Sequence, residues 1–261
     1  MFEARIQQAT LIKKVLEAIR ELVTECNLDC SETGIALQAM DSTHVALVVL
    51  LLRADGFDPY RCDRNLPLGV NLQNLNKILK CADNDDILTI RADDTGDHLT
   101  VVFENKDNEK VSEYQLKLMD IDGEHLGIPE TEYDAVVRLS SAEFQRICRD
   151  LSNVSESVRI DVSKEGVKFV AEGEIGNGTV TLKQSSSVDK DDEESTEIDL
   201  TQSVSLSFSL KYLGNFTKAT PLSTRVSLSM ASETPLLVEY QMSNLGYIRF
   251  YLAPKLEENA E

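Results

Sequence analysis

The sequence predicts an α+β protein made of two similar domains. Three observations lead to this prediction: short amphipathic helical segments, strands between them that alternate polar and apolar residues, and a spacing that repeats along the chain. With 261 residues, the chain has room for one large domain or for two of about 130 residues. The repeated spacing favours two.

The first predicted helix covers Leu11 to Leu22, with the sequence LIKKVLEAIREL. At about 100° per residue, its apolar side chains fall on one face, while Lys13, Glu17 and Arg20 fall on the other. This outer face is mostly basic, although the formal net charge of the chain is -19. A charged helix face is usually only solvated, so this helix alone identifies no binding site.

Three later segments repeat the pattern of the first helix: LNKILK (75–80), FQRICR (144–149) and LGNFTK (213–218). Aligned this way, Lys14, Lys77, Arg146 and Asn215 are equivalent, at separations of 63, 69 and 69 residues. The segments TGIAL (33–37) and EGVKF (165–169) are offset by 132 residues, as are Lys14 and Arg146. Two segments at one offset favour a duplicated domain.

The segments between the predicted helices have the period of two that is typical of strands. SVSLSFSL (203–210) alternates serine with apolar residues, and VRIDV and VKFVA flank a turn at 164–166. The longest apolar run, VALVVLLL (45–52), indicates a strand buried on both faces and is far shorter than the roughly 20 residues of a membrane span. Ser140 and Glu143 form a capping box at the start of the third helix. We therefore expect antiparallel sheets with one solvated face, covered by helices.

A segment without helical or strand periodicity separates the two halves. Residues 119–133 contain five acidic residues and a Gly-Ile-Pro turn signal, which indicates an exposed linker. We predict an N-terminal domain at 1–117, a linker at 118–134, a C-terminal domain at 135–256 and an acidic tail at 257–261.

Two acidic motifs identify no metal site. The Asp-x-Asp-Gly at 120–123 lacks the later acidic ligands of a calcium loop, and the acidic run at 189–194 is most simply a solvated loop.

No motif with catalytic chemistry is present. His44, His98 and His125 are not spaced as zinc ligands or as a catalytic pair, and GEIGNG (173–178) lacks the spacing of a phosphate-binding loop. The five cysteines follow no regular spacing, which predicts reduced thiols, and the N-terminus is unlike a secretory signal. We expect an intracellular protein that binds partners, without enzymatic activity, cofactor or metal.

Four longer stretches resemble the eukaryotic DNA sliding-clamp family, the family of proliferating cell nuclear antigen. They are GIALQAMDSTHVALVVLLLRADGF (34–57), YRCDRNLPLGVNLQNLNKILKCA (60–82), LGIPE (126–130) and YLAPK (251–255). The resemblance extends from residue 1 to about 258. It implies the clamp fold, with two similar domains per chain, sheets outside and four helices facing the hole of a nuclear homotrimeric ring that encircles duplex DNA.

A simple geometric estimate agrees with three chains. Twelve helices spaced about 8–10 Å apart form a circle roughly 30–38 Å across, and subtracting a helix width of about 10 Å leaves room for a duplex. Eight helices would leave a hole of roughly 10–15 Å, which is too narrow.

The resemblance places the basic helix faces in the hole, where contacts to phosphates carry no sequence information and allow sliding. The residues expected to contact DNA are Lys13, Lys14, Arg20, Arg61, Arg64, Lys77, Lys80, Lys110, Arg146, Arg149 and Lys218. Lys110 comes from the resemblance alone, and Asn215 leaves the fourth helix with only Lys218.

The resemblance also implies a hydrophobic pocket for a partner motif that contains Gln and paired aromatic residues, docked as a helical turn. The expected pocket residues are Met40, His44, Val45, Leu47, Leu126, Ile128, Pro129, Tyr133, Thr234, Pro235, Tyr251, Leu252, Ala253, Pro254 and Lys255. Thr234 replaces a small aliphatic residue of the family. For His44, a packed histidine near the start of a strand is almost as good an interpretation as a partner contact.

Contacts between chains are expected where KVSEYQLK (110–117) of one chain pairs with NGTVTLK (177–183) of the next, because an unpaired edge strand favours aggregation. The interface residues we expect are Cys81, Tyr114, Leu116, Cys148, Thr179 and Thr181. For both cysteines, packing within one domain is an open alternative. Lys164 resembles the family's site of ubiquitin-type modification, and from the sequence alone it is an exposed lysine.

The function implied by the resemblance is that of a processivity factor for replicative DNA polymerase and a docking platform for replication and repair proteins. The partners implied are double-stranded DNA, two further copies of the chain, polymerases of the delta type, a clamp loader, a flap endonuclease and a DNA ligase, with no membrane. The alternative is a clamp-fold scaffold subunit of a hetero-assembled, checkpoint-type ring.

Overall fold

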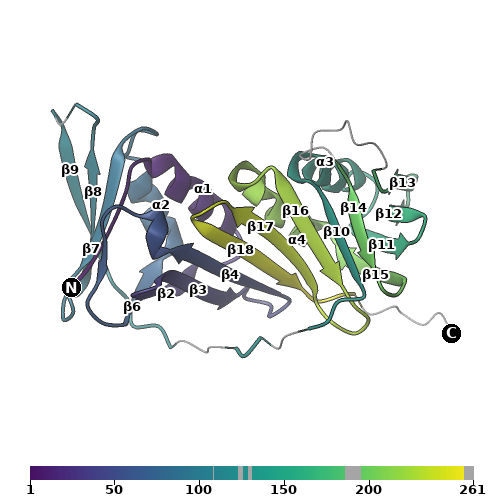
Figure 1. Ribbon diagram of the computed structural model, residues 1–261, viewed down its shortest axis with the longest axis horizontal. Coiled ribbons are helices and arrows are strands. Elements are labelled where there is room, and N and C mark those ends of the chain that lie inside the picture. Colours follow the sequence, from purple (N-terminus) through teal and green to yellow (C-terminus); the bar gives the residue numbers. More distant parts are fainter. Residues whose placement is uncertain (108, 123–125, 129–130, 186–194, 256–261) are drawn as a thin grey trace. The chain divides into compact units, whose positions relative to one another are not determined.

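The computed structural model describes residues 1–107, 109–122, 126–128, 131–185 and 195–255 (Figure 1). The chain forms two compact units: unit 1 contains residues 1–42, 48–127 and 242–248, and unit 2 contains residues 43–47, 128–241 and 249–261. One strand ends at Lys117 and the next begins at Ala135, the limits that the sequence analysis gives to the linker. The units differ from those domains by the exchange of short segments around 43–47 and 242–248.

The first half of the chain is rich in short strands and contains two α-helices (Figure 1). Its elements are β1 (Phe2–Ile6), α1 (Ala9–Ile19), β2 (Glu25–Ser31), β3 (Gly34–Met40), β4 (Ala46–Arg53), the 3₁₀ turn η1 (Ala54–Gly56), β5 (Tyr60–Cys62), β6 (Leu66–Asn71), α2 (Leu72–Leu79), β7 (Ile87–Ala92), β8 (His98–Glu104) and β9 (Val111–Lys117).

The second half repeats this arrangement. Its elements are β10 (Ala135–Ser140), α3 (Ser141–Leu151), β11 (Ser157–Ser163), β12 (Gly166–Gly173), β13 (Gly176–Leu182), β14 (Glu197–Leu200), β15 (Val204–Ser209), α4 (Leu210–Phe216), the 3₁₀ helix η2 (Thr217–Leu222), β16 (Arg225–Met230), β17 (Leu236–Met242) and β18 (Gly246–Leu252). The acidic run at 189–194 and the acidic tail at 257–261 lie outside the described residues.

Strand order confirms the duplication. The first half contains two rows of neighbouring strands, β5-β1-β7-β8-β9 and β6-β2-β3-β4. The second half contains the rows β14-β10-β16-β17-β18 and β15-β11-β12-β13, and each strand corresponds to the one at the same place in the matching row of the first half. The hairpins that the sequence aligned at an offset of 132 residues also match, because Ser31 pairs with Gly34 and Ser163 pairs with Gly166. Both glycines have a φ of +141°, which disfavours any residue with a Cβ atom.

The helices have the predicted apolar faces and bury them. In α1, Ile12, Val15 and Ile19 are buried, and α1 packs against α2 as α3 packs against α4. The first helix runs from Ala9 to Ile19 and so ends three residues before the predicted Leu22. The predicted cap of α3 is confirmed, since the Glu143 backbone N–H donates to Ser140 Oγ at 3.5 Å.

The linker begins against the edge of a sheet. The Met119 backbone N–H donates to the Gly69 carbonyl at 2.9 Å, and the two residues form an isolated antiparallel bridge. A Cβ atom on Gly69 would lie 2.0 Å from the Met119 carbonyl oxygen, so only glycine permits this approach. Among the described residues, no helix has the length and hydropathy needed to cross a membrane.

Candidate DNA interface and partner-binding surfaces

The exposed faces of the four helices gather positive charge. Counted from the first residue of each helix to its cap, or to Lys218 in the fourth, these segments contain nine basic residues: Lys13, Lys14, Arg20, Lys77, Lys80, Arg146, Arg149, Lys211 and Lys218. They contain three of the chain's 45 acidic residues, Glu17, Glu143 and Asp150. The average charge of the chain therefore says little about this surface.

In unit 1, the basic side chains differ in how they are engaged. Lys14, Lys77 and Lys80 are exposed, and Lys77 Nζ donates to the neutral Asn74 Oδ1 at 3.4 Å. Lys13 Nζ donates to the carbonyl oxygen of Ala82, which anchors that side chain to the loop after α2.

Arg20 follows the last residue of α1 and has two acidic neighbours. It forms ion pairs with Glu17 at 2.8 Å and with Glu21 at 3.2 Å. Since exposed ion pairs contribute less than about 1 kcal/mol, they leave Arg20 able to exchange partners.

In unit 2, α3 presents two exposed arginines with a shared acidic neighbour. Arg146 and Arg149 are 67% and 71% exposed, and Asp150 lies 3.7 Å and 3.2 Å from them. Lys218 lies in η2, because α4 ends at Phe216. Lys211, exposed in the first turn of α4, was missed because the repeated sequence pattern begins only at Leu213.

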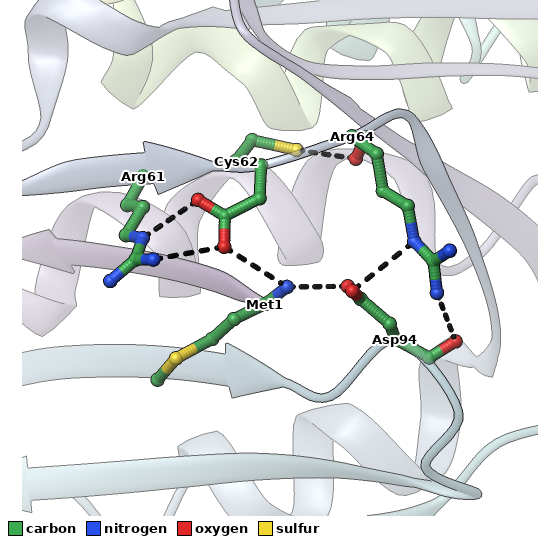
Figure 2. Close-up of polar contacts among 6 residues, drawn as sticks. Met1, Arg61, Cys62, Arg64 and Asp94 are labelled. Carbon is green, nitrogen blue, oxygen red and sulfur yellow. Dashed lines mark hydrogen bonds and ion pairs between the residues drawn. The ribbon is translucent and has the colours of Figure 1, made fainter.

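Arg61 and Arg64 belong to a different environment from the helix residues (Figure 2). They lie on β5 and in the turn that follows it, where Arg61 Nε is 2.8 Å from Asp63 and Arg64 Nε is 3.2 Å from Asp94. The N-terminal amino group of Met1 contacts both carboxylates, and the hydrogen bonds from Arg61 and from this amino group lower the pKa of Asp63 and Asp94 respectively. The charges of Asp63 and Asp94 thus balance those of these two arginines. The remaining predicted DNA contact, Lys110, is elsewhere in the chain and is exposed just before β9.

The part of the predicted peptide pocket that lies in unit 2 combines exposed apolar side chains with two tyrosines. Val45 and Ile128 are 36% and 38% exposed. Tyr133 is close enough to Tyr251 to interact electrostatically, and burial is the largest cause of its raised pKa. The Ala253 backbone N–H donates to the Val45 carbonyl at 3.1 Å, which holds the chain after β18 beside the start of β4.

The other predicted pocket residues of unit 2 differ in their surroundings. Leu252 is fully buried, so its side chain belongs to the core and not to a peptide-binding surface. Thr234 Oγ1 donates to the Ala231 carbonyl at 3.1 Å within a turn. His44 is exposed and has a φ of +58°, so it is not a packed histidine. Pro129 lies outside the described residues.

In unit 1, Leu126 is 40% exposed, and Met40 is half-buried at the end of β3. The described residues contain seven exposed large hydrophobic side chains: Met1, Val45, Val111, Met119, Leu126, Ile128 and Ile175. Three of the seven, Val45, Leu126 and Ile128, were predicted to line the pocket.

Among the described strands, β9 and β13 each end a row and have one neighbour. On β9, Tyr114 hydrogen-bonds the exposed Cys81, which follows α2, and this bond is the largest cause of the raised pKa of Tyr114. Leu116 is buried, while Thr179 and Thr181 on β13 are exposed. The predicted interface residues Cys81 and Tyr114 are therefore neighbours on one surface.

Cys148 differs from this surface set. It is 1% exposed in the core of unit 2, and burial raises the pKa of its thiol to about 12. A side chain without accessible surface makes no direct contact with another chain, so the alternative of packing within one domain holds for Cys148. All five cysteines are free.

The strands equivalent to β9 and β13 in the duplicated order are β18 and β4, and these two are neighbours. In unit 1, the Arg53 N–H at the end of β4 donates to the Leu245 carbonyl just before β18 at 2.6 Å. In unit 2, the bond from Ala253 to Val45 joins the opposite ends of the same strands. The fold thus already contains the antiparallel pairing that β9 and β13 lack.

Lys164 is exposed at the tip of the β11–β12 hairpin, in the turn that the sequence predicted.

A cavity of about 390 Å³ lies elsewhere, over β10, β16 and β17. Its arginines Arg138, Arg225 and Arg249 are ion-paired with carboxylates of this chain, so its charge is balanced internally. Within the described part of the chain, no group of three or more His, Cys, Asp or Glu side chains is arranged to hold a metal ion.

Comparison with known proteins gives a consistent result over the whole chain. The family model described as proliferating cell nuclear antigen, N-terminal domain, matches residues 1–125, and that of the C-terminal domain matches residues 127–255. The chain is 57% identical over 259 residues to the proliferating cell nuclear antigen of Chaetomium thermophilum, which covers 99% of this chain and 100% of that protein.

Proposed function

This chain belongs to the proliferating cell nuclear antigen family and is a DNA sliding clamp, and we propose that three copies close into a ring around duplex DNA. Strands β9 and β13 carry this proposal. Their equivalents β18 and β4 pair inside the chain, so a β9–β13 pairing between chains repeats a contact for which the fold is already built.

The basic helix faces are the proposed DNA-contacting surface. Lys14, Lys77, Lys80, Arg146 and Arg149 are exposed and project on long flexible side chains, which suits contacts to phosphates at variable positions. Lys13, Arg20, Lys110, Lys211 and Lys218 complete the proposed set. Arg61 and Arg64 contribute less, because Asp63 and Asp94 already neutralise them.

Sliding follows from the absence of base contacts in such an arrangement. Phosphate contacts are equivalent at every base pair, so a ring held by them moves along the duplex without a preferred position. The protein then acts in DNA replication and repair by tethering polymerases, without a reaction of its own. We propose a nuclear location on the same grounds.

The residues that we propose to bind partners are the exposed Val45, Leu126 and Ile128, together with Tyr133 and Tyr251. Apolar anchors on a helical turn of the partner would cover these side chains. Replicative polymerase, clamp loader, flap endonuclease and DNA ligase are the proposed partners, and Lys164 is the proposed modification site. A hetero-assembled checkpoint-type ring is not favoured, because the 57% identical relative spans the whole chain.

Solution mass, measured by light scattering after size exclusion, tests the ring directly. A mass near three times 29.1 kDa is expected. A monomer or dimer at micromolar concentration would contradict the closed homotrimer. Charge reversal of Lys77 and Arg149 to Glu then tests the DNA surface: the ring should persist, while processive synthesis by a clamp-dependent polymerase should fall. Normal processivity would refute the assignment.

A further inference from the structure

Three residues on neighbouring strands of unit 1 hold the linker. Gly69 on β6 pairs with Asn27 on β2, and Gln38 lies on β3, the other neighbour of β2. Each of the three bonds the linker: Gly69 bonds Met119, Asn27 Nδ2 donates to the Ile121 carbonyl at 2.9 Å, and Gln38 bonds Leu126.

The bond from Gln38 is the most specific of the three. Gln38 Nε2 donates to the Leu126 carbonyl at 2.8 Å, and the Leu126 N–H donates to Gln38 Oε1 at 3.1 Å. The side-chain amide thereby satisfies both backbone groups of one linker residue, as a neighbouring strand would. Residues of the linker between Ile121 and Leu126 lie outside the described part of the chain, apart from Asp122.

This clamp fixes the backbone of Leu126 while its side chain remains 40% exposed. Gln38 and Met40 are two residues apart on β3, so Met40, a second predicted pocket residue, lies on the same face of the strand as the clamp. An apolar side chain that is already held in place loses less conformational freedom when a partner binds. Local sequence patterns do not indicate this role, because Gln38 occupies an outward position where any polar residue is expected.

We propose that Gln38 is a positioning residue for partner binding, which holds Leu126 ready for the partner's aromatic motif. This inference rests on the proposed partner surface. Gln38 does not need to touch the partner peptide; it acts through the linker backbone. Asn27, which holds the linker five residues earlier at Ile121, should matter less.

The test compares Gln38→Ala and Gln38→Glu with wild type in the full-length assembled protein. The probe is a fluorescent peptide that carries Gln and paired aromatic residues, and its Kd is read by anisotropy. Ala removes both bonds, whereas Glu has nearly the same shape but cannot donate to the Leu126 carbonyl when ionised. Both variants should bind the peptide about tenfold more weakly. Asn27→Asp should show a smaller loss.

Gln73→Glu, an exposed change on α2 with the same charge difference, is the matched control and should bind as wild type. Solution mass and Tm of the Gln38 variants should equal those of wild type, while hydrogen exchange at the Leu126 amide of Gln38→Ala should accelerate without peptide. Wild-type peptide affinity in both Gln38 variants would overturn the inference and leave the partner surface intact. A wild-type protein that does not bind the peptide would instead overturn the proposed partner surface.

Discussion

The second and fourth helices occupy equivalent places in the duplicated fold but have different surfaces. At an offset of 138 residues, Lys77 corresponds to Asn215 and the exposed Cys81 to Ala219, which is fully buried. The difference arises because α2 ends at Leu79, whereas α4 continues into η2, which packs against α3. A position that is exposed just after α2 is therefore buried in η2, although the two helices are equivalent in the strand and helix order.

The largest effect is expected at β9 and β13, which do not pair with each other within the described chain, whereas their equivalents β18 and β4 do. Tyr114→Asp should lower the solution mass from about three times 29.1 kDa to 29.1 kDa, because it puts a charge on the proposed β9–β13 contact. The aromatic ring of Tyr114 packs against that of Phe103, with centroids 5.7 Å apart, and the far-UV circular dichroism of the variant should stay that of a folded chain.

Thr95→Asp, in the turn between β7 and β8, introduces the same charge on an exposed site and should leave the mass unchanged. A trimeric Tyr114→Asp protein would show that β9 is not part of the contact between chains.

Charge reversals sharpen the comparison of the helix faces. Lys77→Glu with Lys80→Glu should weaken duplex binding more than Arg146→Glu with Arg149→Glu, because Asp150 already lies near both arginines. For each phosphate that a variant no longer neutralises, the slope of log K against log salt should become shallower by about 0.9. Fluorescence anisotropy with a labelled duplex over a series of salt concentrations measures both quantities.

Equal losses of affinity in the two double variants would mean that Asp150 does not attenuate the arginines. Asp150→Asn offers a check in the opposite direction, since it should strengthen binding.

The two interface cysteines proposed from the sequence should differ in reactivity. Burial raises the pKa of the Cys148 thiol to about 12, so at pH 8 the thiol, which is the unreactive form, predominates. Because the thiolate is favoured above the pKa, lowering the pH further suppresses its alkylation. Exposed Cys81 should be alkylated in the monomeric Tyr114→Asp variant and be protected in the ring, as peptide mass spectrometry after iodoacetamide would record. Rapid labelling of Cys148 in the folded protein would contradict its buried position.

The hairpin tips give the smallest expected effect on the fold. Lys164 corresponds to Glu32 at the offset of 132 residues, and both side chains are exposed. Lys164→Arg should leave Tm, mass and DNA binding within error of wild type, since exposed substitutions usually change stability by less than about 0.5 kcal/mol. A ubiquitin-ligation assay should nevertheless lose its product, and undiminished ligation would place the modified lysine elsewhere.

Periodicity and repeats predicted the fold well. The four helices, the hairpin around Gly166 and the two-fold duplication follow from buried apolar positions, which sequence patterns record directly. Features that depend on side-chain contacts between distant segments were missed or misplaced. Burial of Cys148 and Leu252, the clamp at Gln38 and the pairing of Arg64 with Asp94 require the tertiary structure, because nothing in local spacing distinguishes them.

The β9 and β13 edges are different strands, and this gives the proposed ring a direction. Contacts of one strand with an unlike strand are head-to-tail, so a closed ring has a three-fold axis but no two-fold axes across it. Its front and back are then chemically distinct, and every partner surface is repeated on the same side. An enzyme that docks there meets the DNA in one orientation. The orientation of the ring on the duplex therefore sets the direction in which the bound enzyme faces.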